Sequence, residues 1–256
     1  MQNSKFKTKN LGAVFFNKLF LSFTLCTLSF TLSAPAALAY PVFPGPAMSG
    51  PTGLVRIPSA DVILYKNFNI GLDYGSTLSS APGASAESAV YYKMNLGTFH
   101  GVEFGIVGGS EKGQNKLREG VFVNMKLSLS TGEEPQPLLL ALGVENLFSY
   151  TQTDVYMVAT KYFKQGPKLT FGFEADFPNY KFRPMGILGI DAPIGDNLFL
   201  LGDLMAGETL FQVNAGVRFY FTPLFSLNIS GLNILDGTQS KDERSALIGF
   251  SWANPF

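Results

Sequence analysis

A hydrophobic period of two residues runs through most of the chain and constrains its fold more than any other feature. Residues 68–75 read Phe-Asn-Ile-Gly-Leu-Asp-Tyr-Gly, and residues 211–219 read Phe-Gln-Val-Asn-Ala-Gly-Val-Arg-Phe. Successive side chains of a β-strand point to opposite faces, so each such segment has one apolar and one polar face. About twelve segments of this kind follow one another, each of ~10 residues, the length that a tilted membrane strand requires.

The composition favours a membrane environment for the apolar faces. Charged residues make up 15% of the chain, whereas a soluble domain usually contains about 25%. Glycine, phenylalanine and tyrosine are frequent, as in barrels with tight turns and aromatic girdles. The formal net charge is zero, so the charge balance indicates no polyanionic partner and we expect no nucleic acid.

The last segment indicates how the sheet is completed. In residues 245–252, Ala246, Ile248, Phe250 and Trp252 share one face. A final strand with an exposed apolar face is an open edge that invites aggregation, and pairing with the first strand removes that edge. The sequence therefore predicts an all-β fold, a closed antiparallel transmembrane β-barrel of about 12 strands, over residues 67–256.

The lengths of the connections alternate along the chain. The long ones, residues 77–87, 110–119 and 235–243, are all odd-numbered, and most even-numbered ones are short. Outer-membrane barrels have short periplasmic turns and longer outer loops. This pattern predicts an even number of strands, with both termini of the barrel on the periplasmic side.

Residues 1–39 have the plan of a secretory signal peptide. Four lysines precede an apolar run from Leu19 to Leu32, and Ala37-Leu38-Ala39 provides small residues for cleavage near Ala39. A membrane-anchor helix is the alternative. The single cysteine, Cys26, lies in the apolar run, so we expect no disulfide in the mature chain. The expected location is the outer membrane of a Gram-negative (diderm) bacterium.

Residues 40–66 form a lead-in that is rich in proline and glycine. Proline lacks the N–H that a central strand needs, yet the stretch from Leu54 to Leu64 is too apolar for a free tail. We expect it to pack at the periplasmic mouth or to enter the lumen as a plug, with Arg56 or Asp61 pairing with a lumen charge. The alternative is a disordered spacer.

The polar faces carry charges of both signs. A lysine or arginine facing lipid at the midplane costs about 2–4 kcal/mol, so these side chains should face inward. They can form a solute-conducting lumen or a set of internal ion pairs that fill a narrow barrel. The predicted lumen-facing charges are Asp73, Lys93, Glu103, Lys126, Glu145, Lys161, Glu174, Asp203 and Arg218; Asp191 is a further candidate.

No residues converge on a catalytic pattern. His100, the only histidine, falls in a short turn, where a triad or a metal site has no surrounding pocket. We therefore predict no enzymatic activity and no catalytic, cofactor-binding or metal-binding residues. A membrane-embedded hydrolase is the least favoured function.

The lead-in contains a more specific motif. Residues 50–62, Gly-Pro-Thr-Gly-Leu-Val-Arg-Ile-Pro-Ser-Ala-Asp-Val, followed by Asn-Phe-Asn-Ile-Gly at 67–71, resemble the opening of the YjbH-like family of outer-membrane proteins. The resemblance covers about a tenth of the chain and implies a non-enzymatic role in surface exopolysaccharide export. Known members are much longer, so this chain would be a single-barrel relative.

Two functions therefore remain open besides the hydrolase. One is a YjbH-like protein that assists polysaccharide export, and the alternative is a small passive, porin-like channel. The expected partners are outer-membrane lipid and lipopolysaccharide, the barrel assembly machinery and, for the first function, a polysaccharide.

Overall fold

The computed structural model describes residues 43–77, 88–111, 120–130, 138–147, 149, 153–163, 166–177, 181–208, 210–235 and 244–255. The expected signal peptide and most residues of the long loops lie outside these ranges. Within them, no helix has the length and apolarity needed to cross a membrane.

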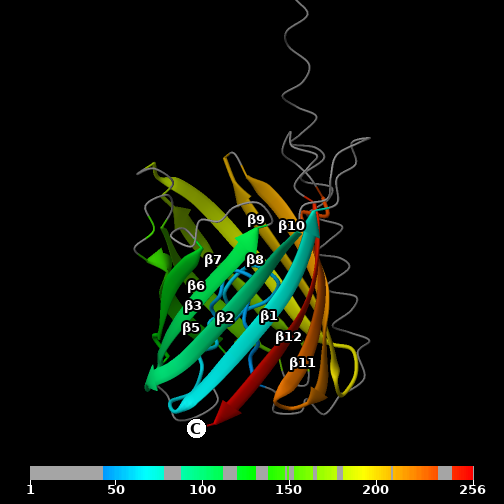
Figure 1. Cartoon of the computed structure of the whole chain (residues 1–256). Helices are drawn as coiled ribbons and strands as arrows, with labels where there is room; N and C mark the ends of the chain where they lie inside the picture. Colours follow the sequence, from blue (N-terminus) through cyan, green and yellow to red (C-terminus); the bar gives the residue numbers. More distant parts are fainter. Residues whose placement is uncertain are drawn as a thin grey trace, which may run out of the picture. The chain divides into compact units, whose positions relative to one another are not determined.

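Twelve antiparallel strands form one closed barrel (Figure 1). Each strand pairs with its neighbours in sequence, and β12 pairs with β1 from Asn67↔Pro255 to Thr77↔Ser245. The closed twelve-strand architecture predicted from the alternation is therefore confirmed. The strands are β1 (Asn67–Thr77), β2 (Ser88–Phe99), β3 (Val102–Glu111), β4 (Val121–Ser128), β5 (Leu138–Leu147), β6 (Asp154–Tyr162), β7 (Lys168–Asp176), β8 (Arg183–Pro193), β9 (Leu198–Gly207), β10 (Phe211–Thr222), β11 (Phe225–Leu232) and β12 (Ser245–Pro255).

The outer face of the barrel is apolar. Leu72 in β1 is 55% exposed, and Phe250, its partner in β12, is 47% exposed. The adjacent Asp73 is only 7% exposed because it points to the opposite face. An apolar outer belt is what a barrel surrounded by hydrocarbon requires.

The two ends of the barrel carry different connections. Because the strands alternate in direction, Asn67 and Pro255 lie at one end with the turns at residues 100–101, 163–167, 194–197 and 223–224. Gly101 in the first of these turns has φ of 76°. The opposite end carries the connections at residues 78–87, 112–120 and 233–244, so the long loops, except residues 129–137, share one end.

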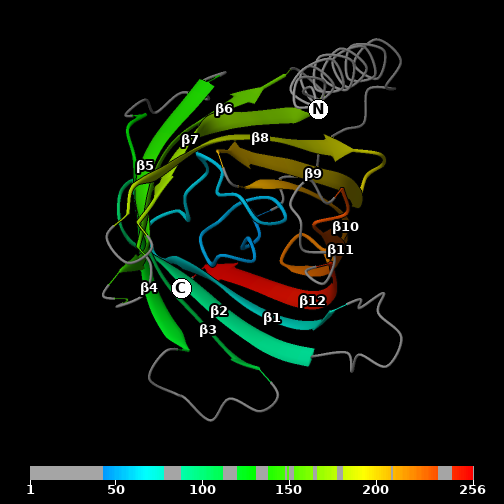
Figure 2. The same cartoon turned by 90° about the horizontal axis from the view of Figure 1, so that it is seen from above.

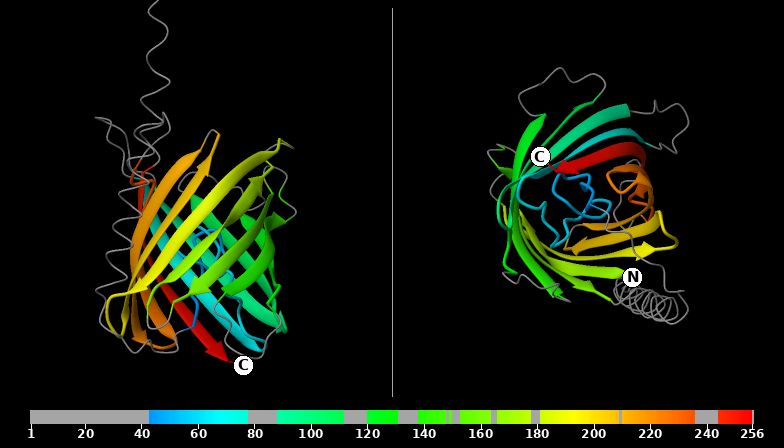
Figure 3. Two further views of the ribbon diagram at one scale, coloured as in Figure 1. Left: turned by 180° about the vertical axis from the view of Figure 1, so that it is seen from behind. Right: turned by 90° about the horizontal axis from the view of Figure 1, so that it is seen from below.

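Residues 43–66, which we call the inner segment, lie inside the ring of strands (Figures 2 and 3). The segment folds back on itself through isolated bridges that pair Pro46 with Thr52 and Gly53 with Pro58. Gly53 is required there, because a Cβ at this position would overlap the carbonyl oxygen of Ile57. The segment is therefore a compact loop structure with hydrogen bonds of its own.

The interior contains an apolar core as well as polar groups. Leu54 and Ile57 of the inner segment pack with Tyr156, Val158 and other buried side chains of β5, β6, β8 and β9. A second cluster joins Val55 to Leu201, Leu232 and Leu247. Packing of this kind is found in the core of a soluble domain, so parts of the barrel wall carry apolar side chains on both faces.

Candidate functional site: the barrel interior

Thr52 is bound by an ion pair from the neighbouring strands β3 and β4. Glu103 accepts a hydrogen bond from the backbone N–H of Thr52 at 2.8 Å and one from the N–H of Ile63 at 2.9 Å. The ammonium of Lys126 donates to the carbonyl oxygens of Thr52 and Ser59 at 2.8 and 3.2 Å and lies 3.6 Å from the Glu103 carboxylate. Hydrogen bonds to charged groups are the strong ones, so this pair is a principal anchor of the inner segment.

A second anchor is the carboxylate of Asp203 in β9. One of its oxygens accepts hydrogen bonds from the backbone N–H groups of Val55, Arg56 and Ile57 at 2.9, 2.7 and 3.3 Å. The other oxygen accepts from the side-chain amide of Asn214 at 2.6 Å. Three consecutive N–H groups that converge on one oxygen form an anion-binding nest, which fixes the tip of the inner segment.

The first part of the inner segment is held by β2 and β4. Lys93, ion-paired with Asp73, donates to the carbonyl oxygen of Ala47 at 2.9 Å. The amides of Asn95 and Asn124 donate to the carbonyl oxygens of Gly50 and Ser49 at 2.7 and 3.0 Å. These bonds satisfy backbone groups that would otherwise be buried without partners.

Arg218 in β10 and Glu145 in β5 both contact the inner segment from the inward face of the wall. The Arg218 guanidinium lies 3.4 Å from the carbonyl oxygens of Gly53 and Leu54 and donates to Asn228 at 2.6 Å. A Glu145 oxygen lies 3.0 Å from the Ser49 hydroxyl. Glu174 in β7 is buried and interacts electrostatically with Arg56.

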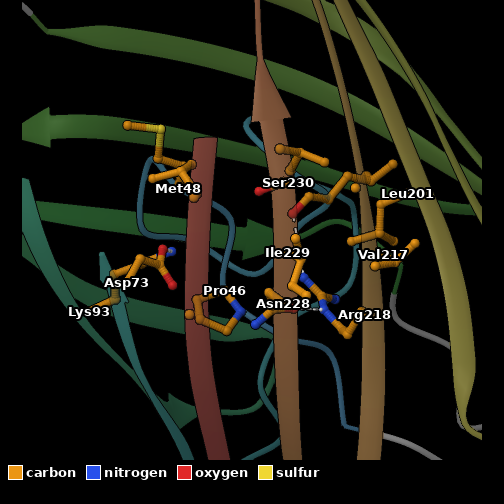
Figure 4. A pocket seen from close by; sticks show the side chains of 15 residues that line it. Pro46, Met48, Asp73, Lys93, Leu201, Val217, Arg218, Asn228, Ile229 and Ser230 are labelled. Atoms are coloured by element: carbon orange, nitrogen blue, oxygen red, sulfur yellow. Dashed lines mark hydrogen bonds and ion pairs between the residues drawn. The ribbon is translucent and has the colours of Figure 1, made fainter. Parts of the chain in front are cut away.

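A small void remains beside Arg218, between the inner segment and the wall (Figure 4). Its volume is about 20 Å³, which is room for about one water molecule. Pro46 and Met48 of the inner segment line it together with Asp73 and Lys93. The inner segment thus leaves little free space on this side of the barrel.

Asp61 anchors the last part of the inner segment to β6 and β7. It lies 3.6 Å from the Lys168 ammonium and accepts a hydrogen bond from the Tyr162 hydroxyl. Burial favours the neutral acid, but the Lys168 charge and the hydrogen bond from Tyr162 outweigh it, so the pKa of Asp61 is lowered from its ordinary value of 3.8. Asp61 is therefore a carboxylate at neutral pH.

Eight of the nine charges expected to line the lumen are buried on the inward face: Asp73, Lys93, Glu103, Lys126, Glu145, Glu174, Asp203 and Arg218. Lys161 is the exception, and the expectation that it faces the lumen is wrong. It is exposed on the outer face, with its ammonium 5.2 Å from the centre of the Phe163 ring. Its neighbour Thr160 points inward instead and accepts a hydrogen bond from the Ala60 N–H at 2.8 Å.

The physical reason for this error lies in β6. Its inward residues include Tyr156 and Val158, which pack against the apolar part of the inner segment. Periodicity alone places these apolar side chains toward lipid, and it therefore places Lys161 toward the lumen. Lys161 is tolerated outside because it lies next to the end of the strand, where a long side chain can reach the polar interface.

Several polar residues of the site were not among the predicted lumen charges. Asp154 and Lys168 were missed, as were five buried asparagines with the same parity as the charges in their strands: Asn67, Asn69, Asn95, Asn124 and Asn214. That parity is a signal that could have identified them, since an uncharged amide also prefers the lumen to lipid. No cluster of histidine, cysteine or acidic residues able to hold a metal ion occurs in the described part of the chain.

No family model matches the sequence, and no curated protein matches it significantly. Solved structures do match the fold. The NanC porin superposes with a TM-score of 0.53 at 11% identity, over 72% of this chain and 98% of NanC. The COG4313 outer-membrane channel from Pseudomonas putida F1 superposes with a TM-score of 0.52 at 9% identity, over 78% of this chain and 100% of that channel. The chain therefore has the barrel fold of outer-membrane channels.

Proposed function

We propose that this protein is a non-enzymatic outer-membrane channel that its own inner segment keeps closed at rest. The observation that carries the proposal is the set of anchors that Glu103, Lys126 and Asp203 provide for Thr52 to Ile57. Each hydrogen bond to a charged group contributes about 1.5–3 kcal/mol. Thermal motion alone therefore does not open the lumen, and opening requires an event that competes with these bonds.

Conductance in planar bilayers tests the proposal. The Asp203→Ala variant removes the acceptor for three backbone N–H groups, so we expect frequent opening events that the parent protein lacks. The matched control is Asp196→Ala, in which an exposed aspartate of a turn is removed. A variant lacking residues 42–58 should conduct continuously. If this deletion variant inserts as a barrel and stays as tight as the parent, the inner segment does not close the pore.

The proposed orientation places both ends of the barrel chain in the periplasm. It rests on the end of the barrel that carries most of the long loops, since outer loops are the longer ones in this class. A protease site inserted after Glu208 should then be cleaved on intact cells, and one inserted after Gly195 should not. Cleavage after Gly195 alone would show that the barrel is inverted.

A second candidate function is assistance in exopolysaccharide export, as the YjbH-like resemblance implies. The observation in its favour is that the resembling motif supplies the anchored residues of the inner segment: Thr52, Val55, Arg56 and Ile57 all bond to the wall. Deletion of the gene should then reduce surface polysaccharide, with restoration by the parent protein but not by Asp203→Ala. An unchanged amount of surface polysaccharide in the deletion strain would contradict the export function, and the channel would be the one remaining candidate.

A further inference from the structure

A cavity of about 250 Å³ opens between the inner segment and the wall formed by β7 to β10. Arg56 of the inner segment lines it, and the wall contributes Asp176, Arg183, Met185 and Gln212. Asp176, Arg183 and Gln212 belong to the strand ends next to the connections at residues 177–182 and 208–210. In the orientation proposed above, this cavity opens to the cell exterior.

Polar atoms without partners converge on this cavity. Among the described residues, buried side-chain atoms that lack a hydrogen-bond partner include Arg56 Nε, Asp176 Oδ1 and Gln212 Oε1, and all three residues line the cavity. Buried polar atoms are normally satisfied. One donor and two acceptors are thus available to a ligand.

The charges beside the cavity are arranged in a row across four strands. Glu145 pairs with Asp154, Asp154 with Asp176, and Asp176 with Arg183. Like charges directly opposite each other in a sheet are destabilising. Asp176 interacts with Asp154 by a side-chain hydrogen bond and with the charges of Arg183 and Arg56, so cationic groups are favoured beside it. Arg56 interacts electrostatically with Asp176 and Glu174 and leaves its Nε for an anion.

Apart from Glu208, the rest of the lining is apolar. Phe182, Pro184, Met185 and Leu210 provide hydrocarbon and one aromatic ring. Small-molecule sites are mostly apolar with a few placed polar groups, and drug-sized ones measure about 300–1,000 Å³. This cavity is smaller and fits one small solute with an apolar part.

We propose that the cavity is a binding site for a zwitterionic solute with an apolar side chain, an α-amino acid of the phenylalanine type. Its carboxylate binds the Arg56 guanidinium, and its ammonium binds Asp176 Oδ1 and Gln212 Oε1. Its side chain lies against Met185 and Leu210. This assignment does not depend on conduction, because the ligand binds to the closed protein, with the inner segment in place.

Calorimetric titration of the folded mature protein in detergent micelles tests this assignment. The probes are L-phenylalanine, 3-phenylpropionate, which lacks the ammonium group, and phenethylamine, which lacks the carboxylate. We expect saturable binding of L-phenylalanine and at least tenfold weaker binding of both analogues. Absence of saturable L-phenylalanine binding, or equal affinity for the three probes, overturns the proposal.

Two variants test which residue binds each charged group of the ligand. Arg56→Gln should weaken L-phenylalanine binding at least tenfold and leave phenethylamine binding unchanged, and Asp176→Asn should weaken both ligands. The matched control is Arg244→Gln, an exposed arginine outside the cavity lining. A gel-shift on heating verifies that each variant is a folded barrel; if Arg56→Gln is not folded, Asp176→Asn and Gln212→Leu decide the outcome. Parental affinity in folded Asp176→Asn and Gln212→Leu also overturns the proposal.

Discussion

The ring of Tyr156 in β6 lies across Gly143, its partner in β5. A Cβ at residue 143 would overlap the end of the tyrosine ring. The ring has no room to move away, because Tyr156 is 1% exposed and packs in the cluster that includes Leu54 and Ile57. Gly143 therefore makes space for an aromatic side chain on the inner wall.

Substitution of this glycine should be costly. We expect Gly143→Ala to lower the free energy of unfolding by about 1–3 kcal/mol, the usual cost of overpacking. The matched control is Gly186→Ala, because a Cβ at residue 186 meets only the Ala206 carbonyl oxygen, at 3.9 Å. Urea unfolding of both variants in detergent micelles provides the comparison, and equal stability of the two variants would contradict the packing described here.

Substitution by lysine at two positions of the outer face tests how deeply each position lies in the hydrocarbon layer. Leu72→Lys places an ammonium near the middle of β1, whereas Phe99→Lys places it at the end of β2. We expect the first to cost about 2–4 kcal/mol and the second about 0–1 kcal/mol. The measurement is unfolding of both variants in lipid vesicles. A similar cost at both positions would remove the assignment of Leu72 to the hydrocarbon layer.

Acid should release one anchor of the inner segment. Because the pKa of Asp61 is lowered in the folded protein, its contribution to stability is complete above the pKa of the unfolded state and is lost as the pH falls through the folded pKa. The stability difference between the parent and Asp61→Asn should therefore be constant from pH 7 to pH 5 and should shrink below about pH 4. A difference that disappears already between pH 7 and pH 5 would mean that Asp61 is not ion-paired with Lys168.

The barrel without residues 42–58 should be cation-selective. On the inward register positions, acidic residues outnumber basic ones. A lumen with an excess of one sign concentrates the opposite ions. The reversal potential in a salt gradient measures this selectivity, and an anion-selective deletion variant would contradict it. The acidic residues concerned are Asp73, Glu103, Glu145, Asp154, Glu174, Asp176, Asp191 and Asp203, and the basic ones are Lys93, Lys126, Lys168, Arg183 and Arg218.

The sequence predicts the barrel well where each strand has one lipid face and one polar face. In residues 68–75 of β1 and 211–219 of β10 the alternation separates the outward from the inward residues, because water and lipid impose opposite requirements on the two faces. In β6 the rule fails, since the inner segment presents Leu54 and Ile57 to Tyr156 and Val158. A filled lumen makes apolar residues acceptable on both faces, and periodicity alone does not distinguish them.

The sequence does not predict which residues of the wall bind the inner segment. That Asp203 binds the N–H groups of residues 55–57 depends on where a loop segment of 24 residues, 43–66, is placed inside the barrel. Backbone N–H groups carry no residue-specific signal, so no motif indicates which charge they meet. The sequence predicts that Arg56 or Asp61 pairs with a charged residue of the lumen. Lys168, the partner of Asp61 in the structure, is not among the predicted lumen-facing charges.

The separation in sequence between the anchors has a consequence for biogenesis. The inner segment precedes every strand, yet its partners Asp203 and Arg218 follow 148 and 165 residues later in the chain. Contacts so distant in sequence form slowly, because the intervening loop must first be closed at an entropic cost. Residues 43–66 must therefore stay unaggregated until β9 and β10 arrive, and pairing of β12 with β1 then encloses them. The rate at which this barrel matures should depend on whatever shields Leu54 and Ile57 during that interval.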